Sequence, residues 1–328
     1  MNRRMAVSLF ASLAATLALG CSSPAGQGSG TATGAPGKTK VKLVLNWVPE
    51  PEFGGFYAAR EKGNYDKQGL EVEIIGGGAG VPVVQMVAGG QADFGISGAD
   101  EVLTAKARGA DIVAVYAIYQ KSPQGIMARP ERAKTLADVF AGGSLAIEPG
   151  LSYALFLKEK FGFDKVKVVP YDGGVARFVA EKDFAQQCFV TSEPLAAKKQ
   201  GIKDLNVFLV ADEGFNPYVG VVIARRSTWT TKKDLVKKFV TASREGWQSY
   251  LDDPTPANLV MAKLNTSMSP ETFKDAAEAQ KPLIVSDETK AKGLGVMTKE
   301  RWTTLADQLV KLKVLEKAPN VDEILAQE

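Results

Sequence analysis

Polar and aromatic residues follow the short apolar stretches of this sequence. Asn46 and Trp47, for example, come directly after an apolar stretch that begins at Val41. Amide, hydroxyl and carboxylate groups form hydrogen bonds, and aromatic faces stack on flat rings. Residues of these types at strand ends predict a binding site for a small molecule. The candidate binding residues are Asn46, Trp47, Phe53, Tyr57, Ser97, Glu148, Tyr153, Tyr171, Thr191, Glu193 and Tyr218.

Several of these candidates also have simpler explanations. Trp47 could be an ordinary core residue, and Asn46 could cap a turn. Glu193 could be a carboxylate at a helix start, where the helix dipole favours it. Glu148 is an acidic residue in a turn-prone segment, so its place there does not require a ligand. The binding interpretation therefore rests on the whole set and not on one residue.

The sequence contains no histidine. Its absence excludes Ser-His-Asp and Cys-His catalytic arrangements, histidine-ligated metals and the usual general base near neutral pH. Carboxylate-based hydrolysis and lysine chemistry stay open. The composition therefore favours binding over catalysis, and we predict no catalytic residue, no metal and no cofactor.

Strand-like and helix-like segments alternate along the chain, and this pattern must position the candidate residues. A break is expected at 121–132, and the C-terminal third is helical, with Trp247 and Trp302 on apolar faces. The alternation predicts parallel sheets covered by helices, with ligands at the carboxyl ends of the strands. The expected strands are 41–45, 72–75, 92–97, 112–118, 145–147, 166–169, 187–190, 207–210 and 219–224.

Two successive sets of such segments predict an α/β fold with two lobes and a ligand between them. Lobe 1 is expected to comprise 40–120 and 216–328, and lobe 2 to comprise 121–215. The segments that cross between the lobes would form a hinge.

The N-terminal segment has the features of an export signal. Two arginines precede an apolar run of about 15 residues, which is shorter than the roughly 20 that cross a bilayer. Residues 1–20 are therefore predicted to be a signal peptide. Cys21 follows a small residue, as in bacterial lipoprotein signals, and is predicted to carry the lipid; an ordinary signal peptide is the alternative. Residues 21–39, rich in Gly, Ser, Thr and Ala, are expected to form a flexible tether.

If Cys21 is lipidated, Cys188 has no partner for an internal disulfide, and its apolar neighbours predict a buried thiol. The chain would then be exported and held at the extracytoplasmic face of the membrane by its lipid alone. A net charge of +3, with interspersed charges, gives no argument for nucleic acid.

Five segments in a fixed order carry a family resemblance: 45–47, 55–65, 69–72, 91–95 and 191–194. With their spacing, they resemble the NMT1/THI5-like (SsuA/THI5-like) group of periplasmic solute-binding proteins. The resemblance implies a type II bilobed fold that closes on a small ligand. It also implies a monomeric binding subunit of an ABC importer, with a permease and an ATPase as partners. Members of the group bind thiamine-pyrimidine precursors, riboflavin, sulfonates or nitrate.

Eukaryotic relatives of this group that make the thiamine pyrimidine use a histidine and a cysteine-rich motif. Here Phe53 stands where many members have histidine, and Cys188 alone lies near the cysteine-rich position. These departures disfavour a synthase or lyase activity on the same fold. A sensor that reports to a signalling protein stays open as a third class.

Local chemistry narrows the ligand. The candidate segments are acidic and aromatic, whereas nitrate or a sulfonate would need fixed cations or many N–H donors. A flat, nitrogen-rich heterocycle, neutral or cationic, fits better. An aminopyrimidine of the thiamine pathway is the first choice, riboflavin is the second, and a sulfonate- or nitrate-type anion is a further alternative.

Overall fold

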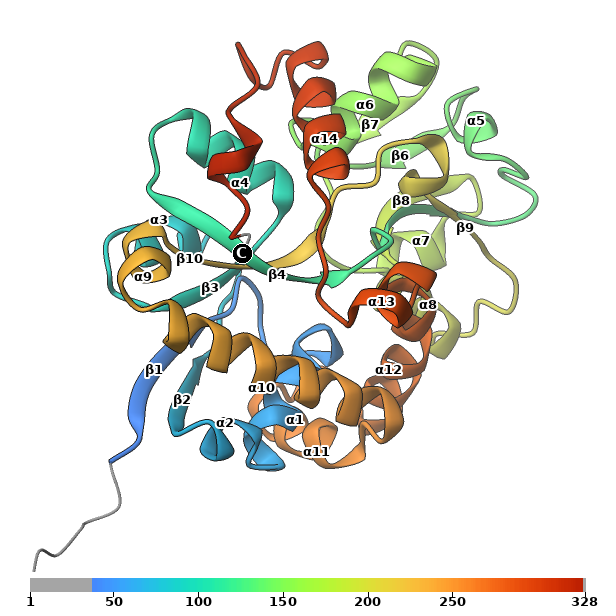
Figure 1. Ribbon diagram of the computed structural model, residues 1–328. Helices are drawn as coiled ribbons and strands as arrows, with labels where there is room; N and C mark the ends of the chain where they lie inside the picture. The colour runs from blue at the N-terminus through green and yellow to red at the C-terminus, as the bar shows by residue number, and fades with distance from the viewer. Residues whose placement is uncertain (1–36, 327–328) are drawn as a thin grey trace, which may run out of the picture. The chain divides into compact units, whose positions relative to one another are not determined.

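Two five-stranded sheets organise the chain (Figure 1). The computed structural model describes residues 37–326, and residues from Lys38 onward form one compact unit. The predicted signal peptide 1–20, the lipidation site Cys21 and the tether up to residue 36 lie outside the described residues. Within residues 37–326, no helix combines the length and the apolar character needed to span a membrane.

Sheet A has the strand order β2-β1-β3-β10-β4. β1 is parallel to β2 and β3, with Val41 opposite Val72, while β10 is antiparallel to β3 and β4. The strands are β1 (Thr39–Val44), β2 (Leu70–Ile75), β3 (Phe94–Ser97), β4 (Ile112–Tyr119) and β10 (Val219–Arg225).

Sheet B has the strand order β7-β6-β8-β5-β9. β6 is parallel to β7 and β8, while β5 is antiparallel to β8 and β9. The strands are β5 (Gln124–Ala128), β6 (Ser144–Ala146), β7 (Lys167–Val169), β8 (Phe184–Phe189) and β9 (Asn206–Leu209). They all lie within 121–215, the range predicted for lobe 2; the division into lobes stays a prediction.

The expectation of purely parallel sheets is wrong, because each sheet contains one reversed strand. β4 continues directly into β5 of the other sheet, and β9 returns to β10 through the short 3-10 helix η2 (Val210–Glu213). β5 and β10 therefore each enter a sheet from the other sheet, and not through a helical crossover between parallel strands of one sheet. β5 was also missed, since it falls inside the expected break at 121–132, where Pro123 and Pro130 suggest a loop.

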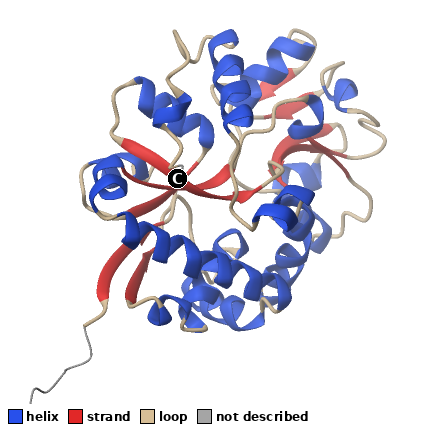
Figure 2. Cartoon of the chain, in the orientation of Figure 1, coloured by secondary structure: helices blue, strands red, loops and turns tan. Residues whose placement is uncertain are grey.

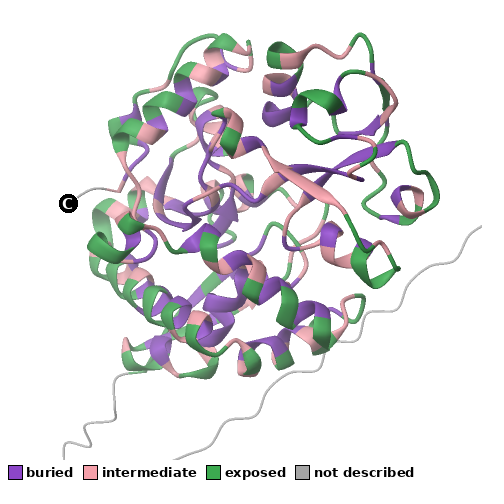
Figure 3. Cartoon of the chain, turned by 90° about the vertical axis from the view of Figure 1, so that its right-hand side faces the viewer, coloured by how far each residue is buried: buried purple, intermediate pink, exposed green. Residues whose placement is uncertain are grey.

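Helices surround both sheets (Figure 2), and the strands are mostly buried (Figure 3). Trp247 and Trp302 are fully buried, as predicted. The helices include α2 (Asn64–Lys67), α3 (Val83–Ala88), α4 (Ala99–Ala107), α5 (Leu136–Val139), α7 (Ala176–Ala180), α9 (Arg226–Thr231), α11 (Thr255–Leu264) and α13 (Asp287–Lys292). A 3-10 helix, η3 (Val321–Glu323), lies near the end of the described residues.

The closest helix packing joins α1 (Gly54–Glu61) to α10 (Lys233–Asp252). A Cβ atom on Gly55 would lie 2.2 Å from the indole ring of Trp247, and one on Gly246 would lie 2.3 Å from the Gly55 carbonyl oxygen. Glycine is therefore required on both helices. This packing holds the N-terminal end of α1, and with it the residues before α1, against the C-terminal helices.

Candidate functional site

A cavity of about 1020 Å³ is lined by residues from the loops and strand ends of both sheets. Ser97 at the end of β3 and Tyr119 at the end of β4 come from sheet A, and Phe189 at the end of β8 comes from sheet B. Of the eleven predicted binding residues, nine line the cavity. They are Asn46, Trp47, Phe53, Ser97, Glu148, Tyr153, Tyr171, Thr191 and Glu193.

Two predicted residues are not in the cavity wall. Tyr57 is 1% exposed, lies in the core beside sheet A and carries the Arg60 guanidinium 5.1 Å above its ring. Tyr218 directly precedes β10 and is buried, and its hydroxyl accepts a hydrogen bond from the Thr298 amide at 3.0 Å. The Arg301 guanidinium stacks on the Tyr218 ring at 3.8 Å.

Trp47 presents an open aromatic face to the cavity. Its side chain is 43% exposed, although it follows strand β1, whose last two residues are buried. The backbone holds this position: the amide of Gly77 donates to the carbonyl oxygen of Trp47 at 2.9 Å. A Cβ atom on Gly77 would lie 2.0 Å from the carbonyl oxygen of Leu45, so glycine is required there. Trp47 is thus placed to stack on a flat ring.

Glu148 is held by a residue that the sequence analysis missed. Gln187 Nε2 donates to Glu148 Oε2 at 2.7 Å, and Gln187 Oε1 accepts from the Glu148 amide at 2.7 Å. The hydroxyl of Tyr153, on α6 (Ser152–Phe161), donates to the same Gln187 oxygen at 2.6 Å. Gln187 lies inside β8. In a strand, a polar residue that faces a cavity looks the same in the sequence as one that faces solvent, so the sequence alone did not mark it. The second oxygen of Glu148 stays available to a ligand.

Glu193 begins α8 (Glu193–Lys199), next to the strand that precedes it. Its Oε2 accepts from the Phe189 amide at 2.8 Å, and its Oε1 accepts a hydrogen bond from the Tyr171 hydroxyl. Burial raises the pKa of the Glu193 carboxyl, and these hydrogen bonds oppose the rise. Glu193 is therefore both a helix-start carboxylate and part of the cavity wall, so the two interpretations made from sequence are compatible.

Glu50 and Glu52 enter the cavity from the segment before α1, around the 3-10 helix η1 (Pro51–Phe53). The buried Gln280 of α12 (Pro270–Ile284) fixes this segment, because its Nε2 donates to the Pro51 carbonyl oxygen at 2.8 Å. Burial raises the pKa of Glu50 to about 7, and the Glu193 carboxylate adds to the rise. Burial likewise raises the pKa of Glu52 to about 8, with contributions from Glu50 and Glu193.

Ser97 is paired with Glu101, another residue that the sequence analysis did not single out. The Ser97 hydroxyl donates to Glu101 Oε2 at 2.7 Å, and the amide of Gly98 donates to the same oxygen at 3.3 Å. Glu101 is the third residue of α4, where a carboxylate caps the helix start. Burial also raises the pKa of the neighbouring Asp100.

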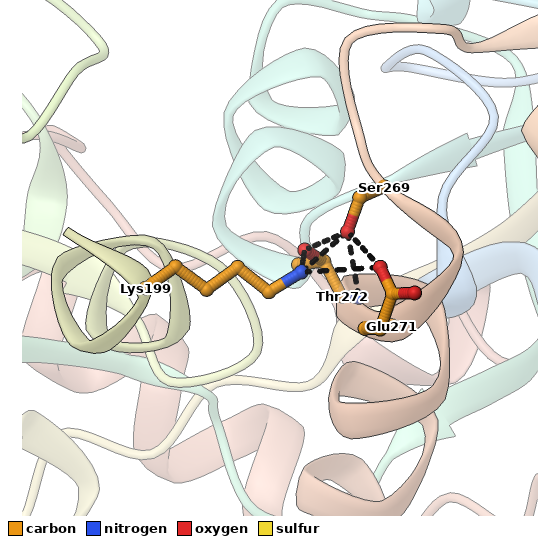
Figure 4. Close-up of polar contacts among 4 residues, drawn as sticks. All are labelled: Lys199, Ser269, Glu271 and Thr272. Carbon is orange, nitrogen blue, oxygen red and sulfur yellow. Dashed lines mark hydrogen bonds and ion pairs between the residues drawn. The ribbon is translucent and has the colours of Figure 1, made fainter.

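Lys199 is the single lysine of the described cavity wall, and no arginine lies in it. The Lys199 ammonium group lies among the hydroxyl groups of Ser269 and Thr272 and 4.0 Å from the Glu271 carboxylate, at the start of α12 (Figure 4). Its hydroxyl partners lie some seventy positions away in the chain, so the sequence gives no local signal for its place in the cavity wall.

The described cavity wall offers groups for hydrogen bonding and stacking, and the cysteine in it is not activated. Cys188 lines it, yet burial raises the pKa of this thiol well above its usual value, so the thiol stays protonated. The predicted buried thiol is confirmed. Within residues 37–326, no group of acidic or cysteine side chains is arranged to hold a metal ion.

The chain matches a known protein family over most of its length. The family described as NMT1/THI5 like matches residues 50–257. The chain belongs to the NMT1/THI5-like family. The resemblance noted from sequence is thereby confirmed.

Relatives of this NMT1/THI5-like chain have different described functions. A riboflavin-binding protein, RibY, of Chloroflexus aurantiacus is 24% identical and covers 82% of this chain and 79% of its own length. A formylaminopyrimidine-binding protein of Halalkalibacterium halodurans is 21% identical and covers 80% and 82%. A 4-amino-5-hydroxymethyl-2-methylpyrimidine phosphate synthase of Saccharomyces cerevisiae is 28% identical but covers only 27% of this chain and 26% of its own.

Among solved structures, the periplasmic aliphatic sulphonate binding protein SsuA of Escherichia coli superposes with a TM-score of 0.67. It is 16% identical and covers 88% of this chain and 92% of its own. This likeness confirms the predicted fold class: the NMT1/THI5-like chain has the bilobed type II periplasmic-binding-protein fold. At this identity the likeness concerns the fold and not the ligand.

Proposed function

We propose that this protein is the solute-binding receptor of an ABC importer and captures a small flat nitrogen heterocycle in the cavity. A thiamine pyrimidine precursor is the first choice of ligand. The observation that carries the proposal is the composition of the wall: an open tryptophan face, Trp47, lies in one cavity with the carboxyl groups of Glu50, Glu148 and Glu193. Carboxylates accept hydrogen bonds from ring amino groups, and the indole stacks on the ring.

The same wall argues against an anion as the ligand. A sulfonate or nitrate needs cations or several free N–H donors. Lys199 is the one lysine of the described wall, and its ammonium group is already surrounded by Ser269, Thr272 and Glu271. The cavity wall is therefore mainly acidic, whereas an anion requires positively charged groups or free N–H donors.

Capture would couple to transport through closure of the two sheets around the ligand. A ligand shifts an equilibrium toward the closed form only if it contacts both sides there. Trp47 from the sheet A side and Glu193 from the sheet B side supply such contacts. The closed form would then dock on a membrane permease with its ATPase, and Cys21 would keep the exported receptor at the membrane by a lipid.

Riboflavin binding is the second candidate ligand assignment, favoured by the similarity to RibY over 82% of this chain. A synthase activity on the same fold is a candidate of another class, favoured by the shorter similarity to the yeast synthase. Phe53 in place of a histidine and the protonated, buried Cys188 weigh against it.

Native mass spectrometry of the purified protein tests the proposal. The panel comprises 4-amino-5-hydroxymethyl-2-methylpyrimidine, formylaminopyrimidine, riboflavin, an alkanesulfonate and nitrate. We expect an added mass equal to an unaltered pyrimidine. Tight binding of the sulfonate or nitrate without any heterocycle would overturn the ligand assignment, and a changed mass of the pyrimidine would support an enzyme instead.

A further inference from the structure

The cavity wall contains many more acids than bases. Its carboxyl side chains are Glu50, Glu52, Asp100, Glu101, Glu148 and Glu193, against one lysine in the described wall. Some of these groups are already satisfied: Glu101 accepts from Ser97, and both oxygens of Glu193 accept hydrogen bonds. The groups that matter are those with acceptor capacity left.

Glu50 and Glu52 have that capacity. Within residues 37–326, Glu52 accepts no hydrogen bond; Glu50 accepts from the Trp47 indole and, at the long distance of 3.5 Å, from Asn265 Nδ2, and a carboxyl group can accept more than two. Both side chains line the cavity on the sheet A side, opposite Glu193 of α8. Glu50 and Glu52 therefore supply carboxyl oxygens with free lone pairs, which suit a nitrogen cation that donates hydrogen bonds, and Glu193 adds negative charge from the other side of the cavity.

The side chains that act on Glu50 and Glu52 are either acidic or uncharged. Glu193 faces it from α8 and repels both carboxylates. Tyr119 faces it from β4, and its own pKa rises, mostly through burial and next through the charge of Glu52. Trp47 and Asn265 donate hydrogen bonds to Glu50. No lysine or arginine is among the described groups that act on the two carboxyls, so the buried negative charge is uncompensated.

Lys199 does not provide the compensation, although it lines the same cavity. Figure 4 shows its ammonium group turned to the start of α12, among Ser269, Glu271 and Thr272. Within residues 37–326, its ion pair is with Glu271, and none joins it to Glu50 or Glu52. Glu50, Glu52 and Glu193 lie close together where little water reaches them, so ionising all three costs much free energy. Protons or a cation must therefore neutralise part of their charge.

We propose, resting on the proposed function, that the ligand is a cation whose charged nitrogen lies between Glu50, Glu52 and Glu193, and that its binding displaces protons from Glu50 and Glu52. In each displacement the carboxyl O–H bond breaks, the proton passes to the solvent buffer, and the carboxylate pairs with the cation. No covalent bond to the ligand forms. The raised pKa values of about 7 and about 8 place the two protons on these carboxyls near neutral pH, which supports the exchange.

A pair of pyrimidines that differ in one group tests this inference. 4-Amino-5-hydroxymethyl-2-methylpyrimidine is neutral at its side chain, whereas its 5-aminomethyl analogue carries an ammonium group of nearly the same size. Isothermal titration calorimetry at about pH 7.5, in two buffers of different ionisation enthalpy, gives both the affinity and the number of protons released. The variants are Glu52→Gln, which is isosteric and neutral, and Glu71→Gln, which alters an exposed carboxylate on β2 as the control.

We expect the aminomethyl compound to bind wild-type protein at least about tenfold more tightly. It should release roughly one proton, because at about pH 7.5 two carboxyls with pKa values of about 7 and about 8 together hold about one. Glu52→Gln is expected to reduce both quantities, and Glu71→Gln neither. Equal or tighter binding of the hydroxymethyl compound, or no proton release by the aminomethyl compound, overturns this inference and leaves the receptor function standing. Failure of both pyrimidines to bind overturns the ligand class in the proposed function and this inference with it.

Discussion

The ammonium group of Lys199 lies within hydrogen-bonding distance of the Thr272 hydroxyl, although the two residues are 73 positions apart. Lys199 ends α8, which follows sheet B in the chain, and Thr272 lies in the first turn of α12, in the C-terminal helical part. Both residues line the cavity. This contact joins the two sides of the cavity through a polar bridge that does not involve the carboxyl groups of the proposed site.

The bridge predicts an effect on closure. In Lys199→Met the hydrogen bonds to Ser269 and Thr272 disappear, and a net loss of roughly 0.5–1.5 kcal/mol per bond would weaken the closed form. We expect a larger radius of gyration in small-angle X-ray scattering and about two- to tenfold weaker pyrimidine binding. Lys198→Met, at the exposed neighbouring position, is the matched control. Identical scattering for the two variants would contradict the role of the bridge.

Trp47 predicts a loss of binding in a protein that still folds. Its side chain is 43% exposed, so Trp47→Ala removes the buried part of a large side chain, and the free energy of unfolding should fall by roughly 1–2 kcal/mol. Stacking on an aromatic face contributes roughly 1–3 kcal/mol, so affinity for a flat ring should fall about fivefold to 150-fold. Titration calorimetry and urea unfolding measure the two effects. Trp229→Ala, on α9 and outside the cavity wall, should leave affinity unchanged.

Much of the site could be predicted from sequence because it lies at strand ends. Asn46 and Trp47 follow β1, Ser97 is the last residue of β3, and the carboxyl ends of parallel strands meet at one edge of a sheet. The alternation of strands and helices likewise predicted an α/β fold. The positions of the strands and helices depend on local sequence, so the hydrophobic pattern predicts them.

The rest depends on contacts between distant segments. Gln187 and Lys199 reach the cavity through partners far away in the chain, and neither has a local signal. Tyr218 directly precedes β10, and which side its ring faces was settled by Arg301, 83 positions later. The reversed strands β5 and β10 follow from how the chain passes between the sheets, which hydrophobic periodicity does not encode.

The buried acids predict that stability falls as pH rises. In the unfolded chain Glu52 has a pKa of 4.5, and in the folded protein it is about 8; for Glu50 the folded value is about 7. At a pH between the unfolded and the folded pKa, the carboxyl group has lost its proton in the unfolded chain and keeps it in the folded protein. The free energy of unfolding should therefore decrease with rising pH between about 4.5 and 8, by at most about 1.4 kcal/mol per pH unit for each group.

Urea unfolding across this pH window, without ligand, tests the linkage. In Glu50→Gln/Glu52→Gln the two groups no longer titrate, so the double variant should gain stability relative to wild type as pH rises through the window. Glu71→Gln serves as the control, since Glu71 is exposed on β2. Wild-type and double-variant curves that stay parallel would show that the two carboxyls do not carry raised pKa values.

Arg301, in α14 (Lys299–Lys311), connects both segments that cross between the sheets. Its guanidinium donates to the carbonyl oxygen of Gln120, after β4, at 2.5 Å, and to the carbonyl oxygens of Asn216 and Pro217, before β10, at 2.8 and 3.0 Å. Arg301→Met would leave these part-buried acceptors without their donor, so we expect a loss of roughly 2–4 kcal/mol in the free energy of unfolding.

Arg301→Lys separates the loss of charge from the loss of geometry. A lysine keeps the positive charge, but its single ammonium group cannot serve acceptors on two segments or stack flat on the Tyr218 ring as the guanidinium does at 3.8 Å. We therefore expect Arg301→Lys to lose most of the stability that Arg301→Met loses, as measured by urea unfolding. Arg108→Met, at the exposed end of α4, should lose about 0.5 kcal/mol or less. Full stability in Arg301→Lys would mean that charge alone, and not the shape of the guanidinium, holds the two crossing segments together.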